Sequence, residues 1–389
     1  MSKRKYNIVV FGATGFTGSL VAEYLAKNAT ENNILWAIAG RNKNKLQAVK
    51  DKLIAINNNC KSLDILIADV DDYSSLLDVC KQTDAVVTTV GPFILYGENL
   101  VKACVEAKTH YCDITGEPEF VKNMYKKYNE QAKTNKVYIV NCCGFDSIPA
   151  DAGAFYTAMQ LPANEQKTIR GFVSTNASFS GGTFASALHA FSDVAKLTAS
   201  NKASKKSTND KPVNFQPLYF EKELKKWALT MPVIDNSIVA QTAKLRPTIF
   251  GKNFHYNQYL ALKSLGQAIG ITSVVSAMVI GAQLKFTRDL LLNYRKSGEG
   301  PSEQERNKYY FKVIFIGESE TKKVMTKVSG GDPGYTETSK MLSETAMLII
   351  NQKDQLTLEG GVVTPSGLLG QLLIEKLNSK GIKFEILEQ

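Results

Sequence analysis

The sequence has 389 residues and a mass of 42.8 kDa, a length that favours two or three domains over one. Hydrophobic residues make up 44% and charged residues 22%, a globular composition that excludes a disordered or collagen-like chain. The formal net charge of +10 is spread along the chain without a nucleic-acid-binding motif, so the sequence argues against a nucleic acid partner.

The six cysteines and three histidines show no ligand pattern. No C-x-x-C pair occurs and the histidines are widely scattered, so the sequence predicts no metal site. The N-terminal residues run into an apolar stretch that is too short for a signal peptide. We therefore expect buried thiols in a reducing compartment and a protein that faces the cytosol.

The first 150 residues alternate apolar runs with stretches of helical periodicity. The run 7–11 predicts a strand buried on both faces, and the stretch 17–27 after it has apolar residues at helical spacing. The alternation continues through expected strands at 34–39, 63–68, 85–90, 111–114 and 137–141 and expected helices at 45–54, 74–80, 99–107 and 118–132. This order predicts the α/β class, with residues 1–150 forming an N-terminal Rossmann domain whose parallel sheet is doubly wound.

Three glycines lie in the turn between the first strand and the first helix. Gly12 allows a tight turn, Gly15 lets a pyrophosphate approach the backbone, and Gly18 lets the helix pack close to the strand. The spacing G-x-x-G-x-x-G is one residue longer at its first step than the standard dinucleotide motif. Its position between a strand and a helix predicts a dinucleotide site. The residues expected to bind there are Gly12, Thr14, Gly15, Phe16, Thr17 and Gly18.

The end of the second expected strand bears on the choice of dinucleotide. An acid there binds the ribose 2′-hydroxyl of NAD, and a base pairs with the 2′-phosphate of NADP. The residues found are Gly40-Arg41-Asn42, with no carboxylate nearby. Arg41 therefore favours NADP(H) over NAD(H).

Two further loops follow expected strands of this sheet. Asp69 comes after the third strand, where a carboxylate contacts the adenine edge or caps the next helix. Gly91 and Pro92 come after the fourth strand, where they fix the backbone beside the cofactor or form only a rigid turn. All three residues are candidates for the cofactor site.

These motifs and several later ones resemble the saccharopine dehydrogenase-like oxidoreductases, with bacterial trans-acting enoyl reductases as more distant relatives. The matching segments are Gly12 to Gly18, Gly40 to Asn42, Val90 to Phe93, His110 to Glu117, Gly144 to Asp151, Gly331 to Tyr335 and Gly360 to Pro365. The resemblance implies a Rossmann domain, a second mixed domain and a nicotinamide cofactor. It also implies a location at lipid droplets, mitochondria or other membranes, and it leaves the substrate open.

Beyond residue 150 strands and helices no longer alternate strictly. Strands are expected at 171–177, 309–316 and 324–328, and a helix at 336–350. We expect residues 151–355 to form a mixed α+β domain. Residues 356–389 read as strand, helix and strand, and this segment is a candidate to return to the first domain.

An uncharged stretch covers residues 264–284. It is long enough to cross a bilayer as a helix, but its glutamines, serines and threonine lower its hydrophobicity. Three interpretations stay open: a helix buried at an interface, a spanning helix, or a segment that lies on a lipid surface. The lipid-droplet association of the family favours the cytosolic face of lipid droplets or of intracellular membranes.

A bound nicotinamide implies hydride transfer, and the reaction also needs a proton donor. The candidates near strand ends are His110, Tyr111, Asp113, Asp146 and Ser147. Of these, we expect Tyr111 and Asp113 on the fifth expected strand, and Asp146 in the Gly-Phe-Asp-Ser-Ile-Pro segment, to be catalytic. Asp146 equally fits a cap for the helix that begins near Pro149.

The leading hypothesis is an NADP(H)-dependent oxidoreductase that acts on a lipid-like substrate, such as one of a glycolipid pathway. The alternatives are a catalytically inactive cofactor-binding protein on lipid droplets and a soluble amino-acid reductase of the saccharopine type. The sequence is compatible with a homodimer.

Overall fold

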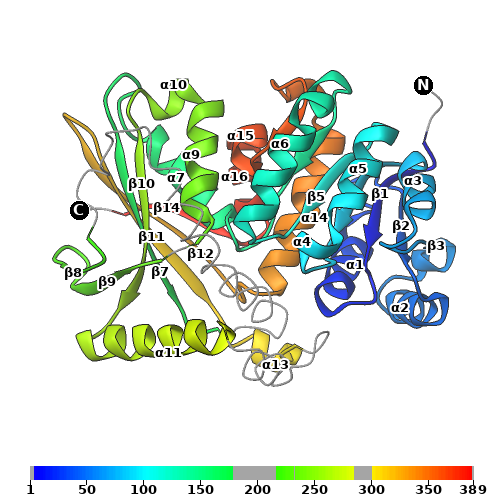
Figure 1. Cartoon of the computed structure of the whole chain (residues 1–389), viewed down its shortest axis with the longest axis horizontal. Helices are drawn as coiled ribbons and strands as arrows, with labels where there is room; N and C mark the ends of the chain where they lie inside the picture. Colours follow the sequence, from blue (N-terminus) through cyan, green and yellow to red (C-terminus); the bar gives the residue numbers. More distant parts are fainter. Residues whose placement is uncertain (1–3, 178–215, 232, 284–299, 388–389) are drawn as a thin grey trace.

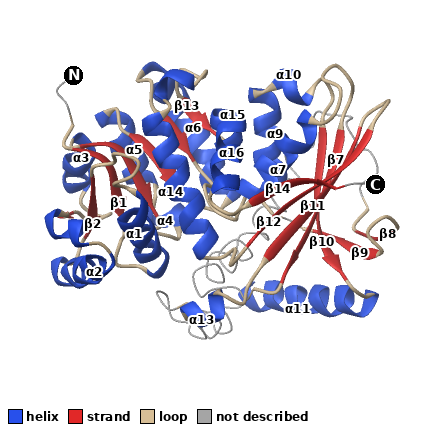
Figure 2. Ribbon diagram, turned by 180° about the vertical axis from the view of Figure 1, so that it is seen from behind, coloured by secondary structure: helices blue, strands red, loops and turns tan. Residues whose placement is uncertain are grey.

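The structure is a computed structural model of the whole chain, and it describes residues 4–177, 216–231, 233–283 and 300–387 (Figure 1). The described residues form two sheets that stand next to each other, with helices between and around them (Figures 1 and 2). The expected α/β architecture, a Rossmann sheet followed by a second mixed sheet, is confirmed.

The first sheet has seven parallel strands among the described residues, in the order β13-β6-β5-β4-β1-β2-β3. Their bounds are β1 (Tyr6–Phe11), β2 (Trp36–Gly40), β3 (Asp64–Ile67), β4 (Thr83–Thr88), β5 (His110–Asp113), β6 (Tyr138–Val140) and β13 (Gly361–Val363). The strand order reverses between β1 and β4, so the sheet is doubly wound. In such sheets ligands bind beyond the carboxyl ends of the strands at this reversal.

Helices cover both faces of the first sheet. They are α1 (Phe16–Asn28), α2 (Lys43–Ile56), α3 (Tyr73–Lys81), α4 (Phe93–Tyr96), α5 (Glu98–Ala107), α6 (Pro118–Thr134) and α14 (Thr336–Asn351), with a 3-10 turn at Asn58–Ser62. Successive side chains of a strand point to opposite faces. Ile8 and Val10 of β1 therefore join the apolar cluster with α1 and α14, whereas Val9 and Phe11 join the cluster with α3, α5 and α6.

The second sheet is mixed. Its described strands follow the order β14-β12-β11-β7-β10-β9-β8, in which only the β10–β7 pair is parallel. Their bounds are β7 (Thr168–Thr175), β8 (Leu218–Glu221), β9 (Lys226–Thr230), β10 (His255–Leu262), β11 (Phe311–Glu318), β12 (Lys323–Gly330) and β14 (Lys383–Leu387). The remaining helices are α7 (Ile148–Met159), α9 (Asp235–Leu245), α10 (Pro247–Phe250), α11 (Leu265–Gln283), α13 (Glu303–Arg306), α15 (Pro365–Leu369) and α16 (Gln371–Ser379), with a 3-10 turn at Lys353–Gln355.

The C-terminal part of the chain is shared between the two sheets. Although residues 151–355 were expected to form the second domain, α14 packs along α1 and against β4 and β5 of the first sheet. Within 356–389, β13 pairs with β6 of the first sheet, but the closing strand β14 pairs with β12 of the second. The first sheet is therefore completed by residues more than 200 positions away from β6.

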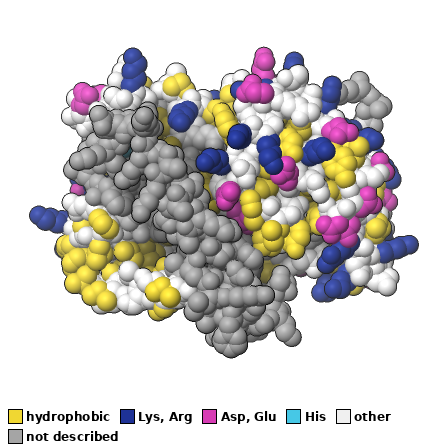
Figure 3. Space-filling model, in the orientation of Figure 1, with side chains coloured by type: hydrophobic (Ala, Val, Ile, Leu, Met, Phe, Trp, Pro, Cys, Tyr) yellow, Lys and Arg dark blue, Asp and Glu magenta, His cyan; other side chains and the backbone are white. Residues whose placement is uncertain are grey.

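Helix α11 occupies most of the uncharged stretch 264–284, of which residue 284 lies outside the described part. It lies along the lower edge of the second sheet in Figure 1 and contacts β9 and β10. Ala268 is buried, but Ile269, Val274 and Ile280 are 57%, 61% and 67% exposed. Figure 3 shows hydrophobic side chains gathered at the lower left, where α11 lies in Figure 1. In the described part of the chain, no helix combines the length and apolarity that a membrane crossing requires.

Candidate active site

The glycine loop after β1 has a shape that only glycines permit at two positions. Gly12 has a φ of +88°, and a Cβ there would lie 2.4 Å from Cγ2 of Val90. A Cβ at Gly18 would lie 2.2 Å from the carbonyl oxygen of Gly12. At Gly15, by contrast, a Cβ would meet only that same oxygen, at 3.4 Å. Any side chain at position 12 or 18 would therefore clash with the protein itself. At Gly15 the protein instead leaves space that a ligand can use.

The N-terminus of α1 opens onto this space. Gly15 is the N-cap and offers no side-chain acceptor, and the first turn contains no acid. Ser19 N donates the first helical bond, to Gly15 O. Among the described residues, the backbone amides of Phe16, Thr17 and Gly18 have no hydrogen-bond acceptor. Free amides and the positive end of the helix dipole together form a site for a phosphate group, so the loop fits a dinucleotide.

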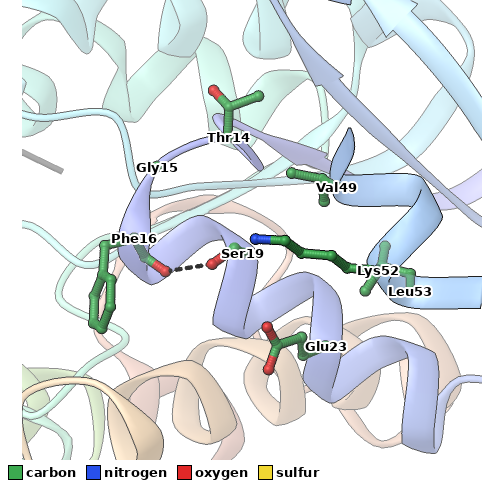
Figure 4. A pocket seen from close by; sticks show the side chains of 8 residues that line it. All are labelled: Thr14, Gly15, Phe16, Ser19, Glu23, Val49, Lys52 and Leu53. Atoms are coloured by element: carbon green, nitrogen blue, oxygen red, sulfur yellow. Dashed lines mark hydrogen bonds between the residues drawn. The ribbon is translucent and has the colours of Figure 1, made fainter. Parts of the chain in front are cut away.

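A hollow lies beside the loop, between α1 and α2 (Figure 4). Thr14, Gly15 and Phe16 line one end of it, and the Lys52 side chain extends from α2 toward Ser19 of α1 (Figure 4). Ser19 itself donates to the carbonyl oxygen of Phe16 at 2.8 Å. The hollow thus places a cation on the α2 side of the loop.

Arg41 follows β2 directly and is exposed. Since β1 and β2 are parallel neighbours, Arg41 lies at the same sheet edge as the glycine loop. Asn42 caps α2 by accepting a hydrogen bond from Lys45 N, while Arg41 has no partner in the described part of the chain. Its guanidinium is therefore available to a 2′-phosphate.

Asp69 and the Gly91–Pro92 turn lie at the ends of β3 and β4. Asp69 is half-buried, and its carboxylate accepts a hydrogen bond from Asp71 N, whereas Asp72 is the residue that caps α3. The Gly91–Pro92 peptide bond is cis. The turn after it is held by Glu117, whose carboxylate accepts from the amides of Phe93 and Ile94 at 3.0 and 2.8 Å.

The three candidate proton donors differ in their exposure to solvent. Asp113 is fully buried, and its carboxylate accepts hydrogen bonds from Thr115 N, Cys142 N and Asn141 Nδ2. Burial raises the pKa of Asp113 to about 6. Tyr111 is also fully buried, and burial raises its pKa. Neither side chain reaches solvent, so neither can reach a substrate in this conformation. Asp113 instead supports the loop after β6 through Asn141 and Cys142.

Asp146 differs from both because it is exposed to solvent. It lies against Gly116, where a Cβ would be 3.2 Å from Oδ2 of Asp146. Protein nevertheless surrounds the carboxyl closely enough that desolvation raises its pKa. No hydrogen-bond partner of Asp146 occurs among the described residues. Nor does Asp146 cap α7, whose N-cap is Ser147.

The loop that carries Asp146 is strained. Cys142 has a φ of +62° and Ser147 a φ of +149°, both unusual for residues other than glycine. Ser147 Oγ donates a hydrogen bond of 2.7 Å to Asp235 of α9. Strained backbone concentrates at functional sites. Sequence reasoning missed Asp235, because nothing in its local sequence distinguishes it from an ordinary acid in the first turn of a helix.

The second half of the chain also reaches the glycine loop. The Phe16 ring packs edge-on against Tyr335, with the ring centroids 4.8 Å apart. The Arg306 guanidinium lies 5.7 Å from the same ring, and Gly300 packs directly on it. Only the backbone of Phe16 is therefore left for a cofactor, since its side chain joins the two halves of the molecule.

Comparison with known proteins gives a consistent result. Residues 8–140 match the sequence model of the saccharopine dehydrogenase NADP binding domain. The human saccharopine dehydrogenase-like oxidoreductase is 31% identical, over 99% of this chain and 98% of its own. A putative trans-acting enoyl reductase of Mycobacterium tuberculosis is 32% identical, over 98% of this chain and 97% of its own. A lipid droplet localized protein of Caenorhabditis elegans is 31% identical, over 98% of both chains.

Among solved structures, saccharopine dehydrogenase (L-Glu forming) from Saccharomyces cerevisiae has a TM-score of 0.55 at 12% identity. The match covers 98% of this chain and 100% of that one, and it shows a shared fold. The expected family, fold and NADP(H) cofactor are thus confirmed. The chain belongs to the saccharopine dehydrogenase-like oxidoreductase family, and residues 8–140 form its NADP-binding domain.

Proposed function

We propose that this protein is an NADPH-dependent oxidoreductase that reduces a lipid-like substrate at the surface of a lipid droplet or intracellular membrane. The observation that carries this proposal is the shared sheet edge, where free amides at the head of α1 and the solvent-exposed carboxyl of Asp146 occur together. The free amides bind the cofactor, and the Asp146 carboxyl supplies protons.

The cofactor contacts follow from the open positions of this edge. The amides of Phe16, Thr17 and Gly18 hold the diphosphate, and Gly15 lets it approach. Arg41 pairs with the 2′-phosphate, since it is the exposed cation directly after β2. Further contacts come from Gly12, Thr14, Asp69, Gly91 and Pro92.

The proposed reaction is the reduction of a polarised double bond. Bound NADPH supplies the hydride for one carbon of that bond. Asp146 supplies the proton for its neighbour, and the resulting carboxylate takes up a proton from solvent. Asp113 contributes indirectly, because it holds the loop that carries Asp146 through its hydrogen bond from Cys142 N.

Apolar side chains next to the Gly91–Pro92 turn fit a lipid substrate. Helix α4 exposes Ile94, Leu95 and Tyr96, of which Leu95 is 60% exposed. A group of exposed apolar residues beside a cofactor site is typical of a binding surface for an apolar ligand. The names of two relatives, an enoyl reductase and a lipid droplet localized protein, agree with this substrate class.

Helix α11 supports the proposed location. Several of its apolar side chains face solvent, and two of its polar side chains are bonded within the helix: Thr272 and Ser273 donate their hydroxyls to the helix carbonyls of Ala268 and Ile269 at 2.8 and 2.9 Å. A helix with this exposed apolar surface suits the surface of a lipid monolayer. Gly300, where the described chain resumes, contacts Phe16 of the cofactor loop.

The activity is tested by NADPH oxidation with long-chain 2-enoyl thioesters, offered in phospholipid vesicles and, separately, in detergent. We expect turnover with NADPH and reduced acyl product by mass spectrometry. Loss of NADPH without reduced product, or tight NADPH binding with no turnover of any lipid extract, would contradict the reaction and favour a protein that binds its cofactor without catalysis.

The location is tested by flotation with phospholipid-coated triolein droplets. We expect wild type to float and the double variant Val274→Asp, Ile280→Asp to stay in the soluble fraction. Leu35→Asp is the matched control, because Leu35 is a similarly exposed apolar residue outside α11. Equal flotation of all three proteins would refute the role of α11. Fractionation of cells then distinguishes droplets from mitochondria.

A further inference from the structure

Asp235 connects the second half of the chain to the loop of the proposed proton donor. It is the first residue of α9 and is buried. Its Oδ1 accepts the 2.7 Å hydrogen bond from Ser147 Oγ, and its Oδ2 accepts one of 2.5 Å from Gln258 Nε2. Gln258 in turn accepts from Tyr256 OH at 2.7 Å. The carboxylate is thus held from β10 on one side and holds Ser147 on the other.

Ser147 needs such a partner because its backbone is strained. A φ of +149° is rarely adopted by a residue with a side chain, and it persists only where surrounding contacts enforce it. The hydrogen bond to Asp235 is one such contact, and it acts on the residue directly after Asp146. The position of the Asp146 carboxyl therefore depends on Asp235, which lies 88 residues away in sequence from Ser147.

The two carboxyls also interact through their charges. Desolvation is the main reason that the pKa of Asp235 rises to about 7, and the charges of Asp146 and Asp151 raise it further. The hydrogen bonds from Ser147 and Gln258 oppose this rise, because they favour the charged form. The other groups that face Asp235 are Tyr256 of β10 and Cys142 of the strained loop. The charge of Asp146 thus acts on Asp235, beside the hydrogen-bonded link that runs through Ser147.

We propose that Asp235 positions the proton donor Asp146. This inference rests on the proposed function, in which Asp146 supplies the proton. Asp235 fixes the Asp146 loop through the hydrogen bond that its carboxylate accepts from Ser147 Oγ. Asp146 remains the catalytic residue, because its carboxyl is the one exposed to solvent. Asp235 is buried and acts through Ser147 and through its charge.

Two variants shift the titration of the two carboxyls in opposite directions. Asp235→Asn removes a like charge near Asp146, so Asp146 should lose its proton at a pH about one unit lower than in wild type. Ser147→Ala removes a hydrogen bond that favours ionised Asp235, so Asp235 should lose its proton at higher pH than in wild type. A merely structural role for Asp235 would not produce shifts of opposite sign.

The shifts are measured without substrate, by infrared titration of the full-length protein labelled with 13C-aspartate and saturated with NADP+. This readout keeps the inference separate from the proposed reaction, since it requires no turnover. The same variants are then assayed with the enoyl thioester. We expect Ser147→Ala to lower kcat about tenfold while the KM for NADPH stays unchanged. Unchanged titration in Asp235→Asn, or shifts of the same sign in both variants, would overturn the proposal.

Misfolding is checked by a second measurement. The folded pKa of Asp235 lies above the ordinary value of 3.8, so its proton stabilises the fold at low pH, and this stabilisation is lost as pH rises through about 7. The free energy of unfolding should therefore fall less steeply between about pH 4 and pH 7, the range between the ordinary and the folded pKa of Asp235, in Asp235→Asn than in wild type. An equally steep fall would show that Asp235 holds no proton in this range and would overturn the part of the proposal that rests on its charge.

Discussion

The carboxyl edge of the first sheet contains two kinds of residue. The first kind is enclosed by protein contacts and comprises Gly12, Gly18 and Asp113. The second kind is open to solvent or to ligand and comprises Gly15, Arg41 and Asp146. The members of both kinds lie at or after the carboxyl ends of parallel strands, and they look alike in sequence. The difference teaches that the space around the Cβ or side chain of an enclosed residue is used up by the protein, whereas the same space at an open residue is left for a ligand or for chemistry. Backbone amides, such as that of Gly18, are available at both kinds.

Replacing the enclosed carboxyl tests the comparison most severely. Asp113→Ala leaves Thr115 N, Cys142 N and the Asn141 amide buried without their acceptor. We expect the free energy of unfolding to fall by about 4 kcal/mol, measured by urea denaturation. Asp146→Ala is the control, and it should change stability by less than about 1 kcal/mol because its carboxyl has no described partner. Equal losses of unfolding free energy in the two variants would contradict the distinction between an enclosed and an open carboxyl.

Replacing the open carboxyl has its largest effect on the reaction. Asp146→Asn keeps the shape of the side chain but cannot supply the proton, so kcat with the enoyl thioester should fall about 100-fold. NADPH affinity, measured by fluorescence titration, should stay within about twofold, since the phosphate site lies at the head of α1. Full activity in Asp146→Asn would show that a group other than Asp146 supplies the proton.

The two kinds of glycine sharpen the comparison further. Gly18→Ala forces a Cβ onto the Gly12 carbonyl, and we expect a loss of about 2 kcal/mol in unfolding free energy. Gly15→Ala meets no such clash within the protein, so its stability should change little, while NADPH binding weakens as the Cβ enters the diphosphate space. Calorimetry measures both quantities on one sample. Gly15→Ala with wild-type affinity would place the diphosphate elsewhere.

Arg41 has the smallest predicted effect. Arg41→Ala should weaken NADPH binding about tenfold and leave NADH binding unchanged, because only NADPH has the 2′-phosphate. Lys43→Ala is the matched control, an exposed cation two residues further on. A loss that is equal for both cofactors would mean that Arg41 contacts a part of the molecule that they share.

Local patterns were enough to predict the strand, glycine loop and helix at the start of the chain, because these elements are neighbours in sequence. The sequence was not enough to separate Asp113 from Asp146, since enclosure depends on donors such as Asn141 that only the folded sheet brings near. Asp235 was missed for the same reason. The composition of residues 264–284 fits a buried helix, a spanning helix and a helix on a lipid surface equally. The sequence could not decide among them, because the choice depends on what packs against α11 in the folded protein.

The pairing of β13 with β6 has a consequence for synthesis of the protein. A ribosome has to complete residue 363 before the outer strand can join the sheet, and α14 has to emerge before the face beside α1 is covered. Until then β6 is a bare edge that invites pairing with other chains. A fragment ending near residue 150 is therefore expected to aggregate on expression, and the cofactor domain is best isolated with residues 336–379 joined back to it.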